Sequence, residues 1–527
     1  MNNHFSITIN SCDELIENQL PNINFPPKVN FVNQNEEVAG YFVSFDKQVS
    51  MSDFGEKLVN SNSDFVLFRR DSKDKTVEIL VDQAGKIPTF FACAKGTLFV
   101  SSKFNNVVDF LRTNKVKITI DLDGLFTGIL WDWHPTEKTL IKQIKKVPPG
   151  CCVKFSFNDP SSFKISSFVD LDSFLENKPE PLKSLPDFAK NWVETVQLVT
   201  ESQLSEIDKL KFGCDLSSGF DCTLVAYCLK KLTNREFFCY SRYSEFTQGE
   251  TNKELLIKFA EKHNLNLKTI DVGRYFRFQF DMRTNMDPTD PYQRSFTADQ
   301  IFLFGLSKEE IEVQFTGEGG DEAYGSRSID KLAKYSIQTG YFNTVSYFRK
   351  YNIQELFTSK AIDYALSNER FNQREFYPLK ISLSAAAVYW HWAEKYRDYG
   401  VYIMAPFIDS RIIDLARKMP ESIKGGMDEL KQVVLKQVPE IFDPGMFQKK
   451  VGLENVYVNF IINQKELIFE VLENSVLANI GLIDKDKMFQ LLKDEKSILY
   501  TNNLAVRFYT MILLDWYFQA NGIVECG

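Results

Sequence analysis

The residues with the clearest chemical potential form a turn, Ser217-Ser218-Gly219-Phe220, between two apolar patterns. Residues 212–216 before it have the length and composition of a short buried strand, and a helix capped by Asp221 is expected after it. Hydroxyl and backbone N–H groups in such a turn point at one spot above a helix N-terminus, which suits phosphate oxygens. Because Asp221 would repel a bare phosphate, the turn predicts pyrophosphate that is held through a bridging Mg²⁺.

A second turn carries three carboxylates among glycines, in the run Gly317-Glu318-Gly319-Gly320-Asp321-Glu322. It follows another short apolar run, residues 312–316, that has the composition of a strand. Alone, such a turn is better explained by an acidic loop in solvent. In the same sheet as the first turn, its glycines would let the backbone approach a ligand. Asp321 can then share Mg²⁺ with Asp221.

The pattern around these turns predicts a sheet that brings them together. Apolar runs alternate with helical patterns, in the order helix 188–204, strand 236–240, helix 252–264 and strand 267–272. This order predicts a doubly wound parallel sheet in an α/β domain with extra helices, where ligands sit beyond the carboxyl ends of the strands. Leu216 and Ser217 would lie at one such end, and Tyr240 and Ser241 at the next.

The first part of the chain has a different pattern, with short β-type runs and two helical stretches, which predicts an α+β domain. Residues 82–88, Asp-Gln-Ala-Gly-Lys-Ile-Pro, indicate a turn between two of these strands. The polar, proline-bearing residues 159–162 and 178–181 predict a linker. Two domains are therefore expected, at residues 1–160 and 180–527.

The chain as a whole has the composition of a globular protein, with 527 residues, 44% hydrophobic and 25% charged. This length is too great for a single core. The formal net charge of -8 argues against a nucleic-acid partner, and no apolar run is long enough to span a membrane. Nine cysteines without a C-x-x-C pair, and no signal peptide, predict a reduced, cytoplasmic protein, and a homodimer stays open.

Taken together, the two turns resemble the signature motifs of the asparagine synthetase superfamily, a group of N-type ATP pyrophosphatases. Ser217, Gly219 and Asp221 match the S-G-G-x-D-S loop of that superfamily. Ser218 replaces a glycine of the loop, and Cys222-Thr223 replaces a pair of serines. The second turn matches the G-E-G-x-D-E signature.

The resemblance implies ATP and Mg²⁺ as cofactors, with adenine against the second strand end. Asp221 and Asp321 would hold Mg²⁺, and Glu318 would act on the amine. Lys450 would act as the catalytic lysine, which stabilises charge on the α-phosphate and on the tetrahedral intermediate. The residues implied in nucleotide binding are Leu216, Ser217, Ser218, Gly219, Asp221, Cys222, Thr223, Tyr240, Ser241 and Gly317.

The first domain resembles the glutaminase domain of the same superfamily, an Ntn-hydrolase-like sandwich, through residues 82–102 and 139–150. Active glutaminases of this kind use an exposed cysteine at position 2 as the nucleophile. Asn2 stands at that position here, and Cys12, the nearest thiol, lies too far inside the chain. The resemblance therefore implies the scaffold without glutamine hydrolysis.

The implied reaction is amide formation, in which ATP adenylates a substrate carboxylate and an amine then displaces AMP. Relatives that lack the cysteine include β-lactam synthetases and lasso peptide macrolactam cyclases, which use an amine on the same substrate. The run Lys449-Lys450-Val451-Gly452 resembles the β-lactam synthetase loop, although the second turn is closer to asparagine synthetase. Tyr402 and Met404 stand where asparagine synthetases carry Glu-x-Arg, which indicates a substrate other than aspartate.

The expected partner is therefore a small molecule or peptide that carries both a carboxylate and an amine, and the leading hypothesis is an intramolecular amide synthetase of a biosynthetic pathway. Two alternatives stay open. One is an asparagine synthetase-like enzyme that uses free ammonia or an external amine. The other is an inactive relative that acts as a binding or scaffold protein.

Overall fold

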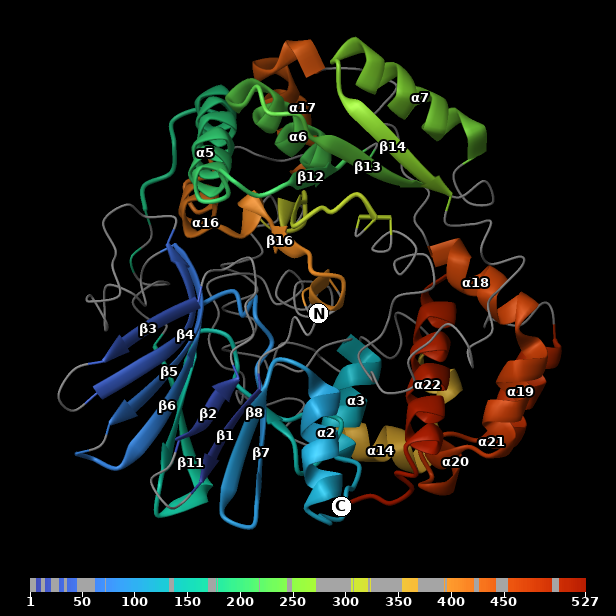
Figure 1. Cartoon of the computed structure of the whole chain (residues 1–527). Helices are drawn as coiled ribbons and strands as arrows, with labels where there is room; N and C mark the ends of the chain where they lie inside the picture. Colours follow the sequence, from blue (N-terminus) through green and yellow to red (C-terminus); the bar gives the residue numbers. More distant parts are fainter. Residues whose placement is uncertain are drawn as a thin grey trace.

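The computed structural model places the described elements in three blocks around a common centre (Figure 1). Two antiparallel sheets form the first block, a parallel sheet with its helices forms the second, and helices from both ends of the chain form the third. The described residues are 6–10, 15–19, 28–32, 36–44, 62–71, 73–131, 137–168, 177, 179–217, 219–243, 249–271, 305–306, 308–320, 323, 353–367, 393, 396–420, 426–441, 454–494 and 502–527.

The first block contains a five-stranded and a six-stranded antiparallel sheet, as the short alternating runs predict. The first sheet has the order β2 (Leu15–Gln19), β1 (Ser6–Asn10), β8 (Thr97–Ser101), β7 (Phe90–Ala94), β9 (Lys145–Lys146). The second has the order β11 (Asp159–Ser167), β10 (Cys151–Ser156), β6 (Thr76–Val81), β5 (Ser63–Asp71), β4 (Glu36–Ser44), β3 (Lys28–Val32). One core that includes Ile7, Phe91 and Val100 of the first sheet and Val66 and Val153 of the second joins them face to face.

Strand β11 corrects the linker predicted at residues 159–162. The segment pairs along its length with β10, from Cys151 opposite Ser167 to Ser156 opposite Asp159. Its outer residues are mostly exposed or half-buried, and Pro160 is tolerated because β11 is the edge strand of its sheet. The polar composition of residues 159–162 therefore belongs to an exposed edge strand.

The third block is a helical core that is built from helices of residues 104–131 and residues 359–520. Helices α2 (Phe104–Thr113) and α3 (Leu122–Trp131) come from the first part of the chain. They share one hydrophobic core with α14 (Ser359–Ser367), α18 (Glu454–Asn463), α19 (Lys465–Glu473), α20 (Val476–Asn479), α21 (Lys485–Lys493) and α22 (Asn502–Ala520). Phe126 of α3 stacks on Tyr364 of α14, and on Phe357, with both ring centroids 5.5 Å from its own. The apolar faces of these segments thus bury one another.

The second block contains the predicted parallel sheet. Its order is β14 (Asn266–Asp271), β13 (Phe238–Tyr243), β12 (Phe212–Asp215), β15 (Val313–Phe315), β16 (Tyr402–Met404). The helices near it are α5 (Leu185–Ser205), α6 (Phe220–Leu232), α7 (Gly249–Lys262), α16 (Ser410–Ala416) and α17 (Gly426–Gln437). The chain runs outward from β12 through β13 to β14 and then returns to the other side of β12 with β15. The switch point of the sheet therefore lies between β12 and β15, where ligands of such sheets bind.

Successive side chains of the parallel strands alternate between two cores, as strand geometry requires. Tyr402 and Met404 pack with α5, α6 and α17, whereas Ile403 and Ala405 pack with Tyr240 on the other face.

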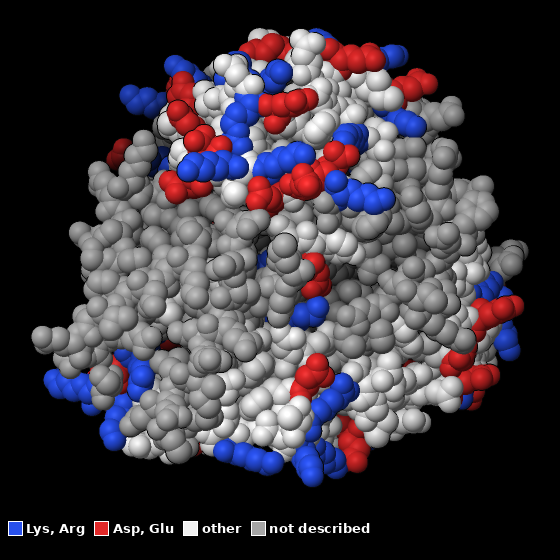
Figure 2. All heavy atoms as spheres, in the orientation of Figure 1, with Lys and Arg blue, Asp and Glu red and all other residues white. Residues whose placement is uncertain are grey.

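Among the described helices, none is long and apolar enough to cross a membrane. On the face drawn in Figure 2, described acidic and basic side chains are interspersed over the parallel-sheet block.

Candidate functional site

The turn after β12 is closed by its own hydrogen bonds. Leu216 N–H donates to the carbonyl oxygen of Tyr240 at 2.8 Å, so the turn begins level with the end of β13. Gly219 N–H donates to Ser217 Oγ at 3.1 Å. Thr223 Oγ donates to the carbonyl oxygens of Ser217, at 3.2 Å, and Gly219, at 2.8 Å. These bonds hold the turn over the N-terminus of α6.

Asp221 lies in the first turn of α6 and is not its N-cap, which corrects the capping prediction. Gly219 occupies the N-cap position, with extended backbone and no side-chain capping bond. A carboxylate in the first turn still lies near the positive end of the helix dipole. The helix therefore positions the side chain of Asp221, and its Oδ1 would lie 2.6 Å from a Cβ added to Gly320 of the second turn.

Lys431 of α17 lies against Asp221, with Nζ 3.5 Å from Oδ2. The side chains are 20% and 13% exposed, so this ion pair is largely shielded from solvent. The sequence contains a signal for it, because Lys431 shares a helix face with Val434, Leu435 and Val438 at spacings of three, four and seven residues. A lysine on an apolar face indicates a buried partner, and no role was predicted for it.

The second turn touches the first, as the sheet order requires. A Cβ added to Gly317 would lie 2.4 Å from the backbone nitrogen of Cys222, and one added to Gly320 would lie 2.4 Å from Cγ of Asp221. Gly319 has φ +88°, which side chains rarely adopt, and packs on Ile408 of η4 (Pro406–Ile408). Glycine is therefore required at three positions of this turn, and the two motifs predicted to meet do meet.

Glu318 stands in the middle of this second turn and is half-buried. Its N–H approaches Thr316 Oγ at 3.4 Å, while Thr316 N–H donates to the carbonyl oxygen of Met404 at 2.8 Å. The turn is thereby tied to both β15 and β16. Ser218, Asp321 and Lys450 lie outside the described residues, so their predicted roles remain predictions.

Tyr240 and Ser241, at the end of β13, are both 2% exposed. Burial raises the pKa of the Tyr240 phenol, so this group is neutral at physiological pH. Beneath the turns, Gln314 Nε2 donates to Asp215 Oδ1 at 2.8 Å between adjacent strands. This buried polar pair ties β12 to β15 at the switch point, and periodicity alone gave no signal for it.

The donor chemistry at this site fits a hard divalent cation in one respect. A carboxylate oxygen is what Mg²⁺ prefers, and Asp221 supplies one beside a helix N-terminus and next to the second turn. Among the described residues no group of three His, Cys, Asp or Glu forms a complete metal site. A cation here would therefore take its remaining ligands from elsewhere, as Mg²⁺ does when phosphates and water complete its shell.

These features define a class, the α/β proteins in which two facing turns stand at the switch point of a parallel sheet. The sequence identifies the family within that class. Residues 200–518, more than half of the chain, match the family described as asparagine synthase, so the chain belongs to the asparagine synthase family. This match confirms the superfamily predicted from the turns. No curated protein matches the sequence.

Similar solved structures are distant. The U34-tRNA thiolase NcsA from Methanococcus maripaludis, solved with its 4Fe-4S cluster, is 11% identical with a TM-score of 0.25; the match covers 64% of this chain and 81% of that chain. A glutamine phosphoribosylpyrophosphate amidotransferase from B. subtilis, complexed with ADP and GMP, is 8% identical with a TM-score of 0.18; that match covers 45% and 59%. Scores this low add nothing to the family assignment.

Proposed function

We propose that this chain is an ATP-dependent ligase that forms an amide bond. A substrate carboxylate attacks the α-phosphate of ATP, which gives an acyl-adenylate and pyrophosphate, and an amine then attacks the acyl carbon and releases AMP. The observation that carries the proposal is the contact of the two glycine turns beside Asp221 at the switch point. Membership of the asparagine synthase family supports it.

The residues of the chain would contribute mainly binding and orientation. N–H groups at the start of α6 would donate hydrogen bonds to phosphate oxygens, while Tyr240 and Ser241 would lie against the nucleotide. Asp221 and Asp321 would hold Mg²⁺, which neutralises pyrophosphate charge when bound. Lys431, already at Asp221, and Lys450 would stabilise the charge that develops during both steps.

The amine is proposed to come from the same substrate rather than from glutamine. Asn2 occupies the position where a glutaminase of this superfamily needs its thiol nucleophile. In addition, the Tyr402 hydroxyl is already bonded to the antiparallel-sheet block, because it donates to Asp64 Oδ2 at 2.7 Å. This polar residue in place of an acidic one favours a substrate other than aspartate, and purified protein is expected to release no glutamate from glutamine.

The experiment is an assay with ATP, Mg²⁺ and a panel of amino-carboxylates and short peptides, in which AMP, pyrophosphate and amide products are followed by mass spectrometry. Aspartate with ammonium belongs in the panel as the test of the ammonia-dependent alternative. AMP and pyrophosphate formed in equal amounts with an amide product would support the proposal, and Asp221→Ala should lose that activity. ADP and phosphate as the products would contradict it.

A further inference from the structure

Arg397, in the segment just before β16, is a buried cation. The residue is 3% exposed, and its Nε, Nη1 and Nη2 atoms make no hydrogen bond to any residue that the structure describes. Arginine stays protonated in proteins, so burial here means burial of a charge. A buried charge without a partner is strongly unfavourable, which means that such a group is retained for a reason other than stability.

Two carboxylates, one next to Arg397 in the sequence and one at this interface, pair with other cations. Asp64 pairs with Lys86 at 2.7 Å, and both side chains are less than a tenth exposed. Asp398, the next residue in the chain, pairs with Lys103 at 2.9 Å. Arg397 is therefore buried, and no carboxylate of the described residues is paired with it.

Arg397 stands where the antiparallel sheets meet the parallel sheet. Its charge acts on the phenols of Tyr41 in β4 and Tyr402 in β16, which belong to different blocks, and it opposes the rise in their pKa that burial causes. Tyr402 in turn donates to Asp64, at the start of β5. The guanidinium therefore lies beside a polar contact between the two blocks.

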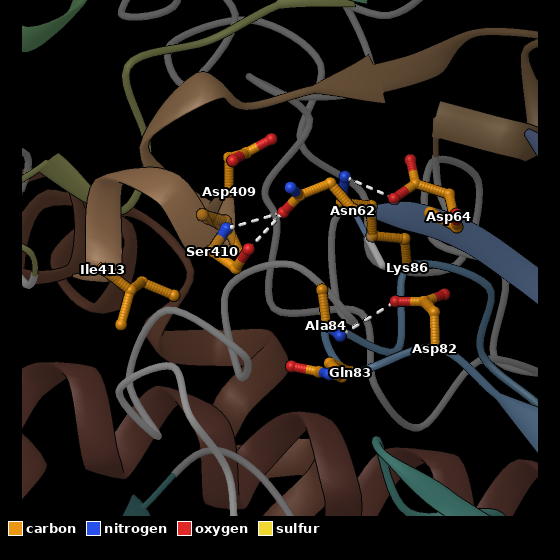
Figure 3. A pocket seen from close by; sticks show the side chains of 11 residues that line it. Asn62, Asp64, Asp82, Gln83, Ala84, Lys86, Asp409, Ser410 and Ile413 are labelled. Atoms are coloured by element: carbon orange, nitrogen blue, oxygen red, sulfur yellow. Dashed lines mark hydrogen bonds and ion pairs between the residues drawn. The ribbon is translucent and has the colours of Figure 1, made fainter. Parts of the chain in front are cut away.

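A chain of contacts connects Asp64, the hydrogen-bond partner of Tyr402, to the proposed nucleotide site. Asp64 and Ile408 line one half-open cavity of about 40 Å³ at the block interface (Figure 3), which is room for a few water molecules. Lys86 points to Asp64 on one side of that cavity, and Ser410 is bonded to Asn62 on the other. Ile408 itself lies against Gly319 of the second turn.

We propose that Arg397 binds a carboxylate of a ligand that enters between the two blocks. In the ligase reaction, on which this part of the inference rests, it is a second carboxylate of the acyl substrate, distinct from the one that is adenylated. The planar guanidinium matches a carboxylate with two parallel hydrogen bonds. A single unmatched positive charge suits a monoanionic group better than a phosphate dianion, because Lys86 is already paired.

The first test is the stability of the ligand-free protein. Arg397→Met removes an unpaired charge and keeps an apolar stem, so its Tm is expected to rise by about 2 °C or more. Arg411→Met is the matched control. Arg411 binds Asp409, whose side chain is 2% exposed, at 2.8 Å, so its loss leaves a buried carboxylate unpaired and Tm should fall. A lower Tm or insoluble protein for Arg397→Met would show that the guanidinium is structural and would overturn the proposal.

The second test is binding of simple anions, measured as the Tm of wild-type protein against acetate, succinate, glutarate and inorganic phosphate at constant ionic strength. A saturable rise with one of the carboxylates is expected, which Arg397→Met abolishes and Arg397→Lys weakens by about tenfold or more because the two-pronged geometry is lost. No saturable rise with any carboxylate, or a rise with phosphate alone, contradicts the proposal.

The Tm rise with Mg²⁺-ATP is measured on the same variants, so that a failure of the ligase proposal can be distinguished from a failure of the carboxylate proposal. Arg397→Met should keep the Tm rise that Mg²⁺-ATP gives, whereas Asp221→Ala should lose it. If carboxylates stabilise the protein through Arg397 while Mg²⁺-ATP has no effect on wild type, the ligase reaction is wrong and the carboxylate site stands.

Discussion

Glycine positions decide whether the two turns can share a site. The Cβ of an alanine at Gly317 would lie 2.4 Å from the Cys222 nitrogen, so the backbone of one turn must move. Gly317→Ala is therefore expected to weaken Mg²⁺-ATP binding by at least about tenfold, or 1.4 kcal/mol. The measurement is calorimetric titration with Mg²⁺-ATP.

Gly481→Ala is the control for that substitution. Gly481 also needs glycine for its backbone, with φ +77°, but no atom lies within 4 Å of an added Cβ. It should lower stability by about 1 kcal/mol and leave the affinity for Mg²⁺-ATP unchanged. Equal affinity in Gly317→Ala and wild type would show that the turns do not form one binding site.

Lys431 is the residue that the structure adds to the expected machinery. Lys431→Met keeps an apolar stem at this position of α17 but removes the charge 3.5 Å from Asp221. If that charge stabilises the transition state, AMP formation falls by about 100-fold or more. Lys436→Met, on the same helix but exposed, is the matched control and should retain full activity. Unchanged AMP formation in Lys431→Met would assign the lysine to packing alone.

At the scale of elements, the turn between β6 and β7 contains a buried titrating group. Asp82 accepts hydrogen bonds from the N–H groups of Ala84 and Gly85 at 2.8 and 2.9 Å. Burial, and then the charge of Asp64, raise its pKa to about 7. An acid whose pKa is raised on folding binds its proton more tightly in the folded state, so the stability it contributes is complete below pH about 4 and is lost as pH rises to about 7.

The pH dependence of stability tests this group. Between pH 5.5 and pH 7.5, above the pI of about 5.4, the Tm of wild type should fall with rising pH. Asp82→Asn keeps an oxygen for the two turn N–H groups and cannot ionise, so its Tm should fall less over the same range. If Tm depends on pH in the same way in both proteins, the group that titrates is not Asp82.

At the scale of the whole molecule, the helical core makes the two parts of the chain depend on each other. Phe126 stacks on residues 357 and 364, and Tyr364 OH donates to Asp123 Oδ1 at 2.6 Å. Arg507 in α22 approaches the carbonyl oxygen of Ile129 at 3.3 Å. Residues 180–527 alone would expose the apolar surface that α2 and α3 cover.

The isolated fragment 180–527 is therefore expected to aggregate or to melt without a cooperative transition, while the full chain melts cooperatively. A milder version is Phe126→Ala in the full chain, which should cost about 3–5 kcal/mol of stability because the ring is fully buried. Denaturant unfolding followed by circular dichroism measures both. A soluble fragment with the affinity of the full chain for Mg²⁺-ATP would refute this interdependence.

Much of the frame around the site follows from local patterns. The apolar run before Ser217 and the glycines after Phe315 predicted strand ends that meet, because strand alternation and turn chemistry are local properties. The pairing of Lys431 with Asp221, the Asp215–Gln314 pair and the buried Arg397 depend on segments that are far apart in sequence. The polar composition of β11 led to a wrong prediction of a linker, since exposed edge strands and linkers have similar amino-acid compositions.

The central claim is that the two turns form one Mg²⁺-nucleotide site, and direct titration of the full chain with Mg²⁺-ATP tests it most plainly. Wild type is expected to bind one ATP per chain in a Mg²⁺-dependent manner, and Asp221→Ala is expected to lose that binding while its circular dichroism spectrum stays unchanged. Lys436→Met should bind as wild type does. No binding by folded wild type, or equal binding by Asp221→Ala, would contradict the claim.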